Sequence, residues 1–188
     1  PYNRGKVLNY EDLEKLESYG RYLDSDNDGI CYRTYPGTHP EKGAYFTRGT
    51  SHDEYARYTE DGNVNAETLM RLMRKFRTAS ELVPEPLIEI NGEDSCGIIF
   101  YGSSKPAVLE AKDILKTKNI NVDLMQIRSF PFNLDVWEFI ANHDRIYVVE
   151  QNRDSQMRTL IMAEGGISAE VLRPVSYTHL RAHETPIN

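Results

Sequence analysis

Residues 96–104, CGIIFYGSS, decide the fold of this chain. The run from 96 to 101 is short and apolar, as a buried strand is, and Gly102-Ser103-Ser104 follows it at once. Residues 107–116 then carry apolar side chains on one helical face, namely Val108, Ala111, Ile114 and Leu115. A strand that leads directly into an amphipathic helix is the repeating unit of α/β proteins.

The same alternation continues toward the C-terminus. We expect a strand at 122–127, a helix at 134–142, a strand at 145–149 and a helix at 155–163. This order predicts an α/β fold with a parallel sheet, helices on both faces and right-handed crossovers.

The prolines of Val83-Pro84-Glu85-Pro86 predict a linker between two domains, 1–86 and 87–173. The first half is irregular, with one helix expected from about residue 10 to 19. A second helix within 67–77 is amphipathic, with apolar positions Leu69, Leu72, Met73 and Phe76. Its basic residues fall mainly on the other faces, which favours a solvated surface over a binding patch; they are Arg71, Arg74, Lys75 and Arg77.

Residues 32–62 form a long segment with little apolar periodicity and many side chains that can bind a ligand. Arginines, histidines and tyrosines alternate there with glycines and prolines. Such a mixture suits a functional loop that holds a polar, anionic small molecule, and a solvated interdomain loop is the alternative.

Several stretches together resemble one known family. They are Asp12-Leu13-Glu14, Tyr19-Gly20-Arg21-Tyr22-Leu23-Asp24, the loop 32–62, residues 69–79, Phe100-Tyr101-Gly102-Ser103-Ser104, and VVEQNRDSQMR at 148–158. Over about nine tenths of its length, the chain resembles the alpha subunit of 2-oxoacid:ferredoxin oxidoreductases. The resemblance is greatest to the 2-oxoglutarate type, 2-oxoglutarate synthase.

This resemblance implies a fold, a reaction and partners. Residues 1–86 would be the C-terminal part of a thiamine pyrimidine-binding domain, and 87–173 a Rossmann-like, transketolase C-terminal-like domain. The complete enzyme would decarboxylate a 2-oxoacid oxidatively to its acyl-coenzyme A and reduce ferredoxin. The expected substrate is 2-oxoglutarate, and pyruvate or another 2-oxoacid is the alternative.

The resemblance also implies where the cofactors lie. Thiamine diphosphate with Mg²⁺ and a 4Fe-4S iron–sulfur cluster would be held mainly by the beta subunit. This chain would contain no catalytic residue and would be an inactive fragment by itself. A non-catalytic Rossmann-like assembly or ligand-binding module is the alternative function.

Four loop residues are candidates for contact with the substrate. Arg33 and Arg48 can offer planar donors to a carboxylate, and His39 or His52 can donate to it or carry a proton. We expect Arg48 or His52 to discriminate the distal carboxylate of 2-oxoglutarate. The alternative is a loop ordered by its own ion pairs, such as Arg57 with Asp53 or Glu54.

The run Asp24-Ser25-Asp26-Asn27-Asp28-Gly29 matches the first half of a calcium loop. The glutamate expected at the twelfth position is replaced by Tyr35, so a plain acidic turn is favoured. Asp24, Asp26 and Asp28 are the only residues that we consider as metal ligands.

Two segments directly follow predicted strands, where ligands bind in parallel sheets. They are Gly102-Ser103-Ser104 and Glu150-Gln151-Asn152-Arg153. No G-x-G-x-x-G is present, so an independent dinucleotide site is not expected. Gln151, Asn152 and Arg153 are expected to make contacts between domains or subunits. For Ser103 and Ser104, capping of the helix that follows is the alternative to ligand binding.

Composition sets the remaining limits. The net charge of −7 argues against nucleic acid as the main partner, and no run is long and apolar enough for a membrane span. Two distant cysteines predict neither a disulfide framework nor a four-cysteine cluster within the chain. The expected location is the cytoplasm. Residues 174–188, with His179 and His183, are predicted to be a non-native tail.

Overall fold

A computed structural model describes residues 3–48, 51–91 and 96–175 of the chain. The chain divides into two compact units, Pro1–Leu82 (unit 1) and Val83–Asn188 (unit 2), and the division falls at the proline-rich segment. The predicted tail at 174–188 lies almost entirely outside the described residues. No helix in the described ranges is long and apolar enough to span a membrane.

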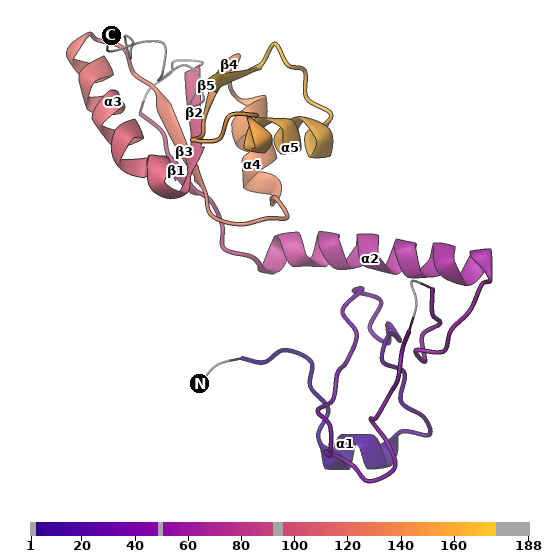
Figure 1. Cartoon of the computed structure of the whole chain (residues 1–188). Coiled ribbons are helices and arrows are strands. Elements are labelled where there is room, and N and C mark those ends of the chain that lie inside the picture. The colour runs from indigo at the N-terminus through magenta and orange to yellow at the C-terminus, as the bar shows by residue number, and fades with distance from the viewer. Residues whose placement is uncertain (1–2, 49–50, 92–95, 176–188) are drawn as a thin grey trace, which may run out of the picture. The chain divides into compact units, whose positions relative to one another are not determined.

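Unit 2 contains one five-stranded sheet with the order β1-β3-β2-β4-β5 (Figure 1). Its strands are β1 (Leu87–Glu89), β2 (Cys96–Tyr101), β3 (Asp123–Ile127), β4 (Arg145–Val149) and β5 (Leu172–Val175). The four strands from β2 to β5 run parallel, and β1 pairs with β3 in the antiparallel direction. The predicted α/β fold is confirmed, and the two edge strands β1 and β5 were not among the predicted strands.

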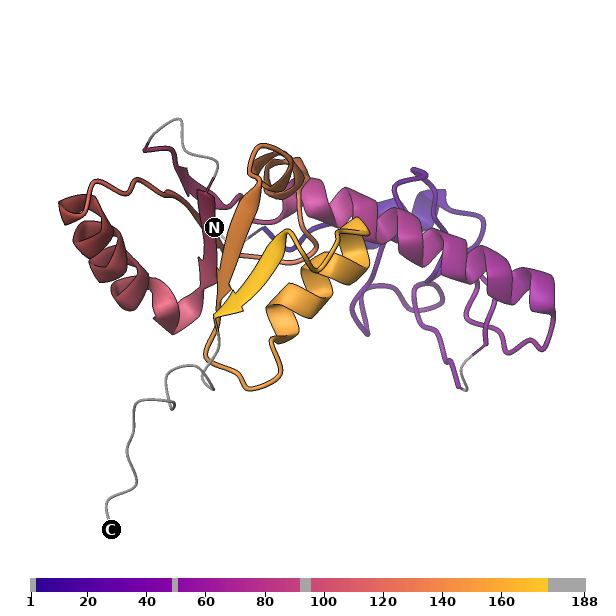
Figure 2. The same ribbon diagram turned by 90° about the horizontal axis from the view of Figure 1, so that it is seen from above.

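Three helices cover this sheet. They are α3 (Lys105–Thr117), which follows the short 3-10 turn η1 (Gly102–Ser104), α4 (Leu134–Ala141) and α5 (Gln156–Gly165). α3 lies on one face, and α4 and α5 lie on the other (Figures 1 and 2). The two faces follow from the alternation of side chains along the strands.

Each face of the sheet has its own apolar core. Under α4 and α5, the core centres on Ile99, Met125, Ile146 and Val148, which are fully buried. Under α3 it is smaller and comprises Ile98, Phe100, Val108, Val122 and Leu124. These buried, β-branched and aromatic runs explain why residues 96–101 and 145–149 form central strands.

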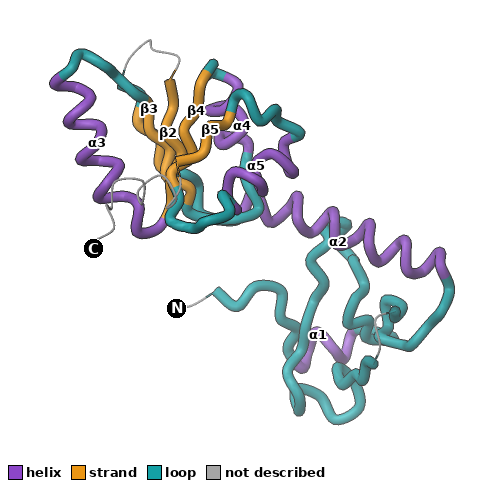
Figure 3. Tube along the Cα trace, turned by 45° about the horizontal axis from the view of Figure 1, so that its top comes forward, coloured by secondary structure: helices purple, strands orange, loops and turns teal. Residues whose placement is uncertain are grey.

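Unit 1 contains mainly loops and two helices, α1 (Tyr10–Lys15) and α2 (Gly62–Leu82) (Figure 3). A capping box starts α1, because Asn9 and Asp12 each bond the backbone N–H of the other. α1 ends earlier than the predicted residue 19, since Leu16 adopts an extended backbone. Leu13 is fully buried, whereas none of the α2 residues is buried.

The faces of α2 differ from the prediction. Arg71 donates to the Gly29 carbonyl, Arg74 pairs with Asp24, and Thr78 donates to the Asp28 carbonyl. The basic side therefore packs on the turn at 24–29, where carbonyl and carboxylate oxygens need donors. The predicted solvated surface is wrong for the two arginines, and Leu69 and Met73 on the apolar side are more than half exposed.

Candidate functional site

The loop 32–62 is ordered by a few polar contacts, and His39 makes the densest set. Its Nδ1 accepts hydrogen bonds from the backbone N–H groups of Glu41 (3.0 Å) and Lys42 (2.9 Å). Its Nε2 lies 2.8 Å from Glu14 Oε1. Because Nδ1 is an acceptor, the hydrogen must be on Nε2. The buried ring of His39 thus has both nitrogens occupied by the protein itself.

The partners of His39 extend this anchor to α1. The hydrogen bond from His39 lowers the pKa of the Glu14 carboxyl. The Tyr10 ring stacks on the imidazole with a centroid distance of 4.9 Å. This arrangement holds the loop against α1, and it leaves His39 without a nitrogen for a substrate.

A second anchor lies at the turn around Asp53. The Asp53 carboxylate accepts from the backbone N–H groups of Tyr55 (2.9 Å) and Arg57 (2.8 Å). The Arg57 guanidinium lies 5.4 Å from the centre of the Tyr55 ring. The turn is therefore ordered by backbone bonds to Asp53, and the ion pair of Arg57 with Asp53 or Glu54, which was the alternative interpretation, does not occur among the described residues.

His52 and Arg48 lie near one another through Tyr58. His52 and Tyr58 form an isolated antiparallel bridge, and the Arg48 guanidinium lies 6.0 Å from the centre of the Tyr58 ring. His52 stacks on Tyr22 at a centroid distance of 3.9 Å, and its Nδ1 is 3.2 Å from the Asp53 carbonyl oxygen. Arg48 is exposed. These two side chains remain available for a ligand.

Arg33 lies apart from this pair. Its guanidinium donates to the Arg4 carbonyl, and its backbone forms a parallel bridge with Val7. The structure thus brings together two of the four predicted substrate contacts, Arg48 and His52. It gives His39 and Arg33 partners within the chain.

A cleft of about 190 Å³ is lined in part by Tyr22, and the sequence did not predict it. Two guanidinium groups and three carboxylates line it, from Arg71, Arg74, Asp24, Glu54 and Glu67. The opposite charges offset one another, and Arg74 already donates twice to one oxygen of Asp24. This cleft therefore lacks the excess positive charge that an anion requires.

The acidic turn at 24–29 binds cationic side chains. Lys6 Nζ lies 2.6 Å from Asp26 Oδ2 and 2.7 Å from Asp28 Oδ2, while Asp24 pairs with Arg74 at 2.9 Å. In the described part of the chain, no group of three or more His, Cys, Asp or Glu side chains is placed to hold a metal ion. The metal-site interpretation of these aspartates is therefore not supported, and the acidic turn is what the geometry shows.

Acid should remove the contribution of Lys6 to stability. The hydrogen bond from Lys6 lowers the pKa of both Asp26 and Asp28 in the folded chain. A carboxyl with a lowered pKa contributes stability above its unfolded pKa, about 3.9, and loses it as the pH falls through the folded value. We expect Lys6→Met to lower the urea midpoint at pH 7 and to lower it less at pH 2, where more of the two carboxyls are protonated. An equal difference at both pH values would contradict this assignment.

At the carboxyl end of β4, the buried carboxylate of Glu150 occupies the N-terminus of α5. It accepts from the backbone N–H groups of Met157 (2.9 Å) and Arg158 (3.2 Å) and from Asn152 Nδ2. A helix N-terminus at a strand end is where such sheets bind anionic ligands. Here the protein supplies the anion, so the predicted ligand position at this edge is filled by Glu150.

Replacing Glu150 should loosen α5. In Glu150→Ala two backbone N–H groups lose their buried acceptor, which costs about 1–3 kcal/mol. We expect a corresponding fall in the free energy of unfolding of unit 2 by urea denaturation, with Glu164→Ala, an exposed position on α5, as the control. Equal stability of the two variants would exclude the capping role.

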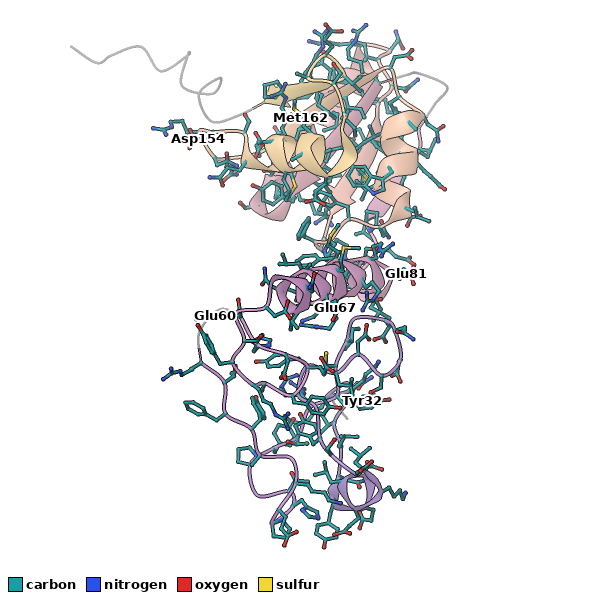
Figure 4. All side chains as sticks on the ribbon, turned by 90° about the vertical axis from the view of Figure 1, so that its right-hand side faces the viewer. Tyr32, Glu60, Glu67, Glu81, Asp154 and Met162 are labelled. Atoms are coloured by element: carbon teal, nitrogen blue, oxygen red, sulfur yellow. The ribbon has the colours of Figure 1, made fainter. Side chains whose placement is uncertain are left out.

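The next three residues differ in their surroundings. Asn152 Oδ1 accepts from the Gln156 N–H, so Asn152 belongs to the same helix start. Gln151 and Arg153 are exposed on the loop before α5, and Arg153 pairs with the neighbouring Asp154, which lies at the outer edge of that loop (Figure 4). Gln151 and Arg153 are thus accessible for the predicted subunit contacts, which stay a prediction.

The amino-acid sequence of this chain is similar to those of two known proteins. No protein-family model matches the chain. The chain is 28% identical over 176 residues to the alpha subunit of 2-oxoacid:ferredoxin oxidoreductase 2 from Aeropyrum pernix. The matched residues make up 90% of this chain and 26% of that protein. It is also 29% identical over 169 residues to the 2-oxoacid:ferredoxin oxidoreductase alpha subunit from Saccharolobus solfataricus. Here the matched residues make up 87% of this chain and 26% of that protein.

The fold also occurs in a solved structure. The 2-oxoglutarate:ferredoxin oxidoreductase from Magnetococcus marinus, with 2-oxoglutarate, coenzyme A and succinyl-CoA bound, matches 87% of this chain with a TM-score of 0.73 and 23% identity. This chain covers 28% of that chain. The chain therefore spans about a quarter of the length of the proteins that it matches, and it is similar over nearly its whole length to a segment of the alpha subunits of 2-oxoacid:ferredoxin oxidoreductases.

Proposed function

We propose that this chain is a segment of the alpha subunit of a 2-oxoacid:ferredoxin oxidoreductase that acts together with a beta subunit. The complete enzyme takes a 2-oxoacid and coenzyme A, releases carbon dioxide and an acyl-coenzyme A, and passes two electrons to ferredoxin. The similarity to two alpha subunits, which extends in order through both units, is the observation that carries this proposal.

The cofactors of this reaction do not fit this chain by itself. The described residues contain no metal-ligand cluster, and Cys31 and Cys96 lie in different units. We assign thiamine diphosphate, Mg²⁺ and the iron–sulfur cluster mainly to the beta subunit, as the resemblance to the family implies. The contribution of this chain is to position the substrate and to assemble the complex.

The proposed substrate is 2-oxoglutarate. Its second carboxylate distinguishes it from pyruvate, and a guanidinium with an imidazole can recognise such a group. Arg48 and His52 are the two predicted residues whose side chains keep donors available. Both residues lie next to Tyr58, His52 through a backbone bridge and Arg48 through its guanidinium.

Arg48→Ala and His52→Ala should alter selectivity in the full complex. We expect each variant to lower kcat/KM for 2-oxoglutarate by about 10-fold relative to pyruvate, the effect of one lost charge-assisted hydrogen bond. Arg57→Ala is the matched control, because this exposed arginine lies on the same turn and its guanidinium faces the Tyr55 ring. An unchanged ratio of the two kcat/KM values would exclude both residues from substrate selection.

The function itself is tested on the complete reading frame from the source DNA. This frame is co-expressed anaerobically with the neighbouring beta-subunit gene, and coenzyme A-dependent dye reduction is measured with 2-oxoglutarate and with pyruvate. We expect turnover with a preference for 2-oxoglutarate. A preference for pyruvate would contradict the substrate, and the absence of turnover in a cofactor-loaded complex would favour the alternative of a non-catalytic assembly module.

A further inference from the structure

Contacts with three other parts of unit 1 hold His52 in place. Its backbone forms an antiparallel bridge with Tyr58 on the same loop. Its imidazole stacks on the Tyr22 ring, with a centroid distance of 3.9 Å and an angle of 20° between the two planes. The Thr68 hydroxyl of α2 donates to the His52 carbonyl oxygen at 3.4 Å. The orientation of the imidazole is therefore set by the fold of unit 1.

The two ring nitrogens of His52 have different surroundings. Nδ1 lies 3.2 Å from the Asp53 carbonyl oxygen. Because a carbonyl can only accept, Nδ1 donates the hydrogen, and in the neutral imidazole Nε2 then carries a lone pair. No residue in the described part of the chain bonds Nε2, which is thus the nitrogen left for a ligand. A carboxylate also has only lone pairs to offer, so Nε2 can bind it only when the ring is the imidazolium.

The charged groups around His52 come from the same three parts of unit 1. Guanidinium groups lie against the tyrosine rings of this region, and they belong to Arg21, Arg48, Arg57 and Arg71. Carboxylates lie on the loop and in the cleft that Tyr22 lines, and they belong to Asp53, Glu54, Glu60 and Glu67. Guanidinium groups stay charged near neutral pH, and carboxylates stay ionised above about pH 6. The hydrogen bond to Glu60 raises the pKa of Tyr58, so this hydroxyl stays neutral. Among all these groups, an imidazole is the one that changes its charge near neutral pH.

We propose that His52 binds the distal carboxylate of 2-oxoglutarate as the imidazolium, so that a proton enters the site with this substrate and the preference over pyruvate falls as the pH rises. The inference rests on the proposed function, in which Arg48 and His52 select the substrate. Arg48 supplies a permanent charge, whereas His52 supplies a donor only after Nε2 takes a proton from the solvent. Pyruvate lacks the distal carboxylate and therefore binds without this proton.

The ratio of kcat/KM for 2-oxoglutarate to kcat/KM for pyruvate tests this proposal, because a titration that affects both substrates equally cancels in the ratio. It is measured on the complete complex from pH 6 to pH 9. We expect the wild-type ratio to fall with rising pH by about 10-fold in all, the effect of one charge-assisted hydrogen bond. The ratio of His52→Ala should stay at the low value throughout. Arg57→Ala, the control on the same turn, should follow the wild-type curve.

Two further measurements separate the proton from the hydrogen bond. In His52→Gln the amide can still donate but does not titrate, so we expect a ratio above that of His52→Ala that does not change with pH. The wild-type complex decides the question where a variant does not assemble. Calorimetric titrations in two buffers of different ionisation enthalpy give the number of protons taken up on binding. At pH 8 we expect glutarate, a dicarboxylate, to bind with about one proton more than butyrate, which lacks the second carboxylate.

Three outcomes would overturn the proposal. They are a wild-type ratio that does not change with pH, a pH-dependent ratio that persists in His52→Gln, and equal proton uptake with glutarate and butyrate. Each of them leaves the proposed function intact as long as the complex converts a 2-oxoacid. A cofactor-loaded complex that converts neither 2-oxoglutarate nor pyruvate would instead refute the proposed function, and this inference with it.

Discussion

Gly29→Ala is expected to detach the acidic turn from α2 and to cost more than about 4 kcal/mol, at the upper end of single-residue effects. Gly29 has a φ of +79°, a left-handed conformation. A Cβ at this position would lie 2.2 Å from the backbone nitrogen of Lys75 and 2.7 Å from the carbonyl oxygen of Arg71. Both atoms belong to the α2 backbone and cannot move aside as a side chain could.

The separation of α2 from the turn would also break the polar contacts between them. Arg71 would lose the Gly29 carbonyl, and Thr78 would lose the Asp28 carbonyl. In proteins, most of the stability of a helix comes from its tertiary contacts and less from intrinsic propensity. We therefore expect the α2 amides of Gly29→Ala to lose protection in hydrogen exchange measured by mass spectrometry on the full chain.

Gly37→Ala is the matched control. Gly37 has nearly the same φ, +80°, but no heavy atom lies within 4 Å of its added Cβ. It reports the backbone strain alone, about 1–2 kcal/mol. The difference between the two variants measures the close approach of α2 to the turn. Equal α2 protection in both variants would mean that this contact does not hold α2 in place.

Asp123→Ala should produce the second large effect, because it opens a buried polar network in unit 2. Asp123 Oδ2 lies 3.1 Å from His143 Nε2, and its Oδ1 accepts from the Asn91 N–H at 2.7 Å. His143 Nδ1 lies 2.6 Å from the Phe139 carbonyl oxygen. A carbonyl can only accept, so Nδ1 donates to Phe139 and Nε2 is the nitrogen that faces the Asp123 carboxylate.

Removing one partner of such a buried pair costs about 3–5 kcal/mol, because the other partner is left without compensation. Both side chains are less than one-tenth exposed, at 7% for Asp123 and 4% for His143. We expect the urea midpoint of unit 2 to fall accordingly in Asp123→Ala. Asp144→Ala, at an exposed position beside His143, should change stability by no more than about 0.5 kcal/mol.

Asp123→Asn distinguishes a need for hydrogen bonds from a need for charge. The asparagine oxygen can still accept from the Asn91 N–H, and its amide can donate to Nε2 of a neutral His143. Every bond of the network is then preserved, so this variant should retain most of the stability lost in Asp123→Ala. A loss as large as that of the alanine variant would show that the network depends on the carboxylate charge.

The second half of the chain was predictable because its signal is local. Short apolar runs at 96–101 and 145–149 have the length and the residue types of buried strands, and their alternation with helices then indicates a parallel sheet. The edge strands β1 and β5 were not predicted, because they lack this local signal. β1 is exposed along its length, and β5 contains Arg173 and Pro174, so neither carries the pattern of a buried strand.

The candidate site was only partly predictable. Residue type alone suggested four substrate contacts, but the partners of a side chain depend on which loops meet in space. His39 receives two backbone N–H groups and a carboxylate, while the contact that the described residues give Arg48 is with an aromatic ring. Glu150 was seen as part of a strand-end segment, and only the position of α5 shows that its carboxylate fills the anion site.

The amino-acid sequence by itself determined the α/β class, the division at the prolines and the family that the chain resembles, because each depends on local pattern or on motif order. Tertiary structure alone decided which face of α2 is packed, which cations neutralise Asp24, Asp26 and Asp28, and which loop residues keep free donors. Hydrogen bonds and charges are satisfied by whichever group lies nearest in space, and residues far apart in the sequence supply those groups.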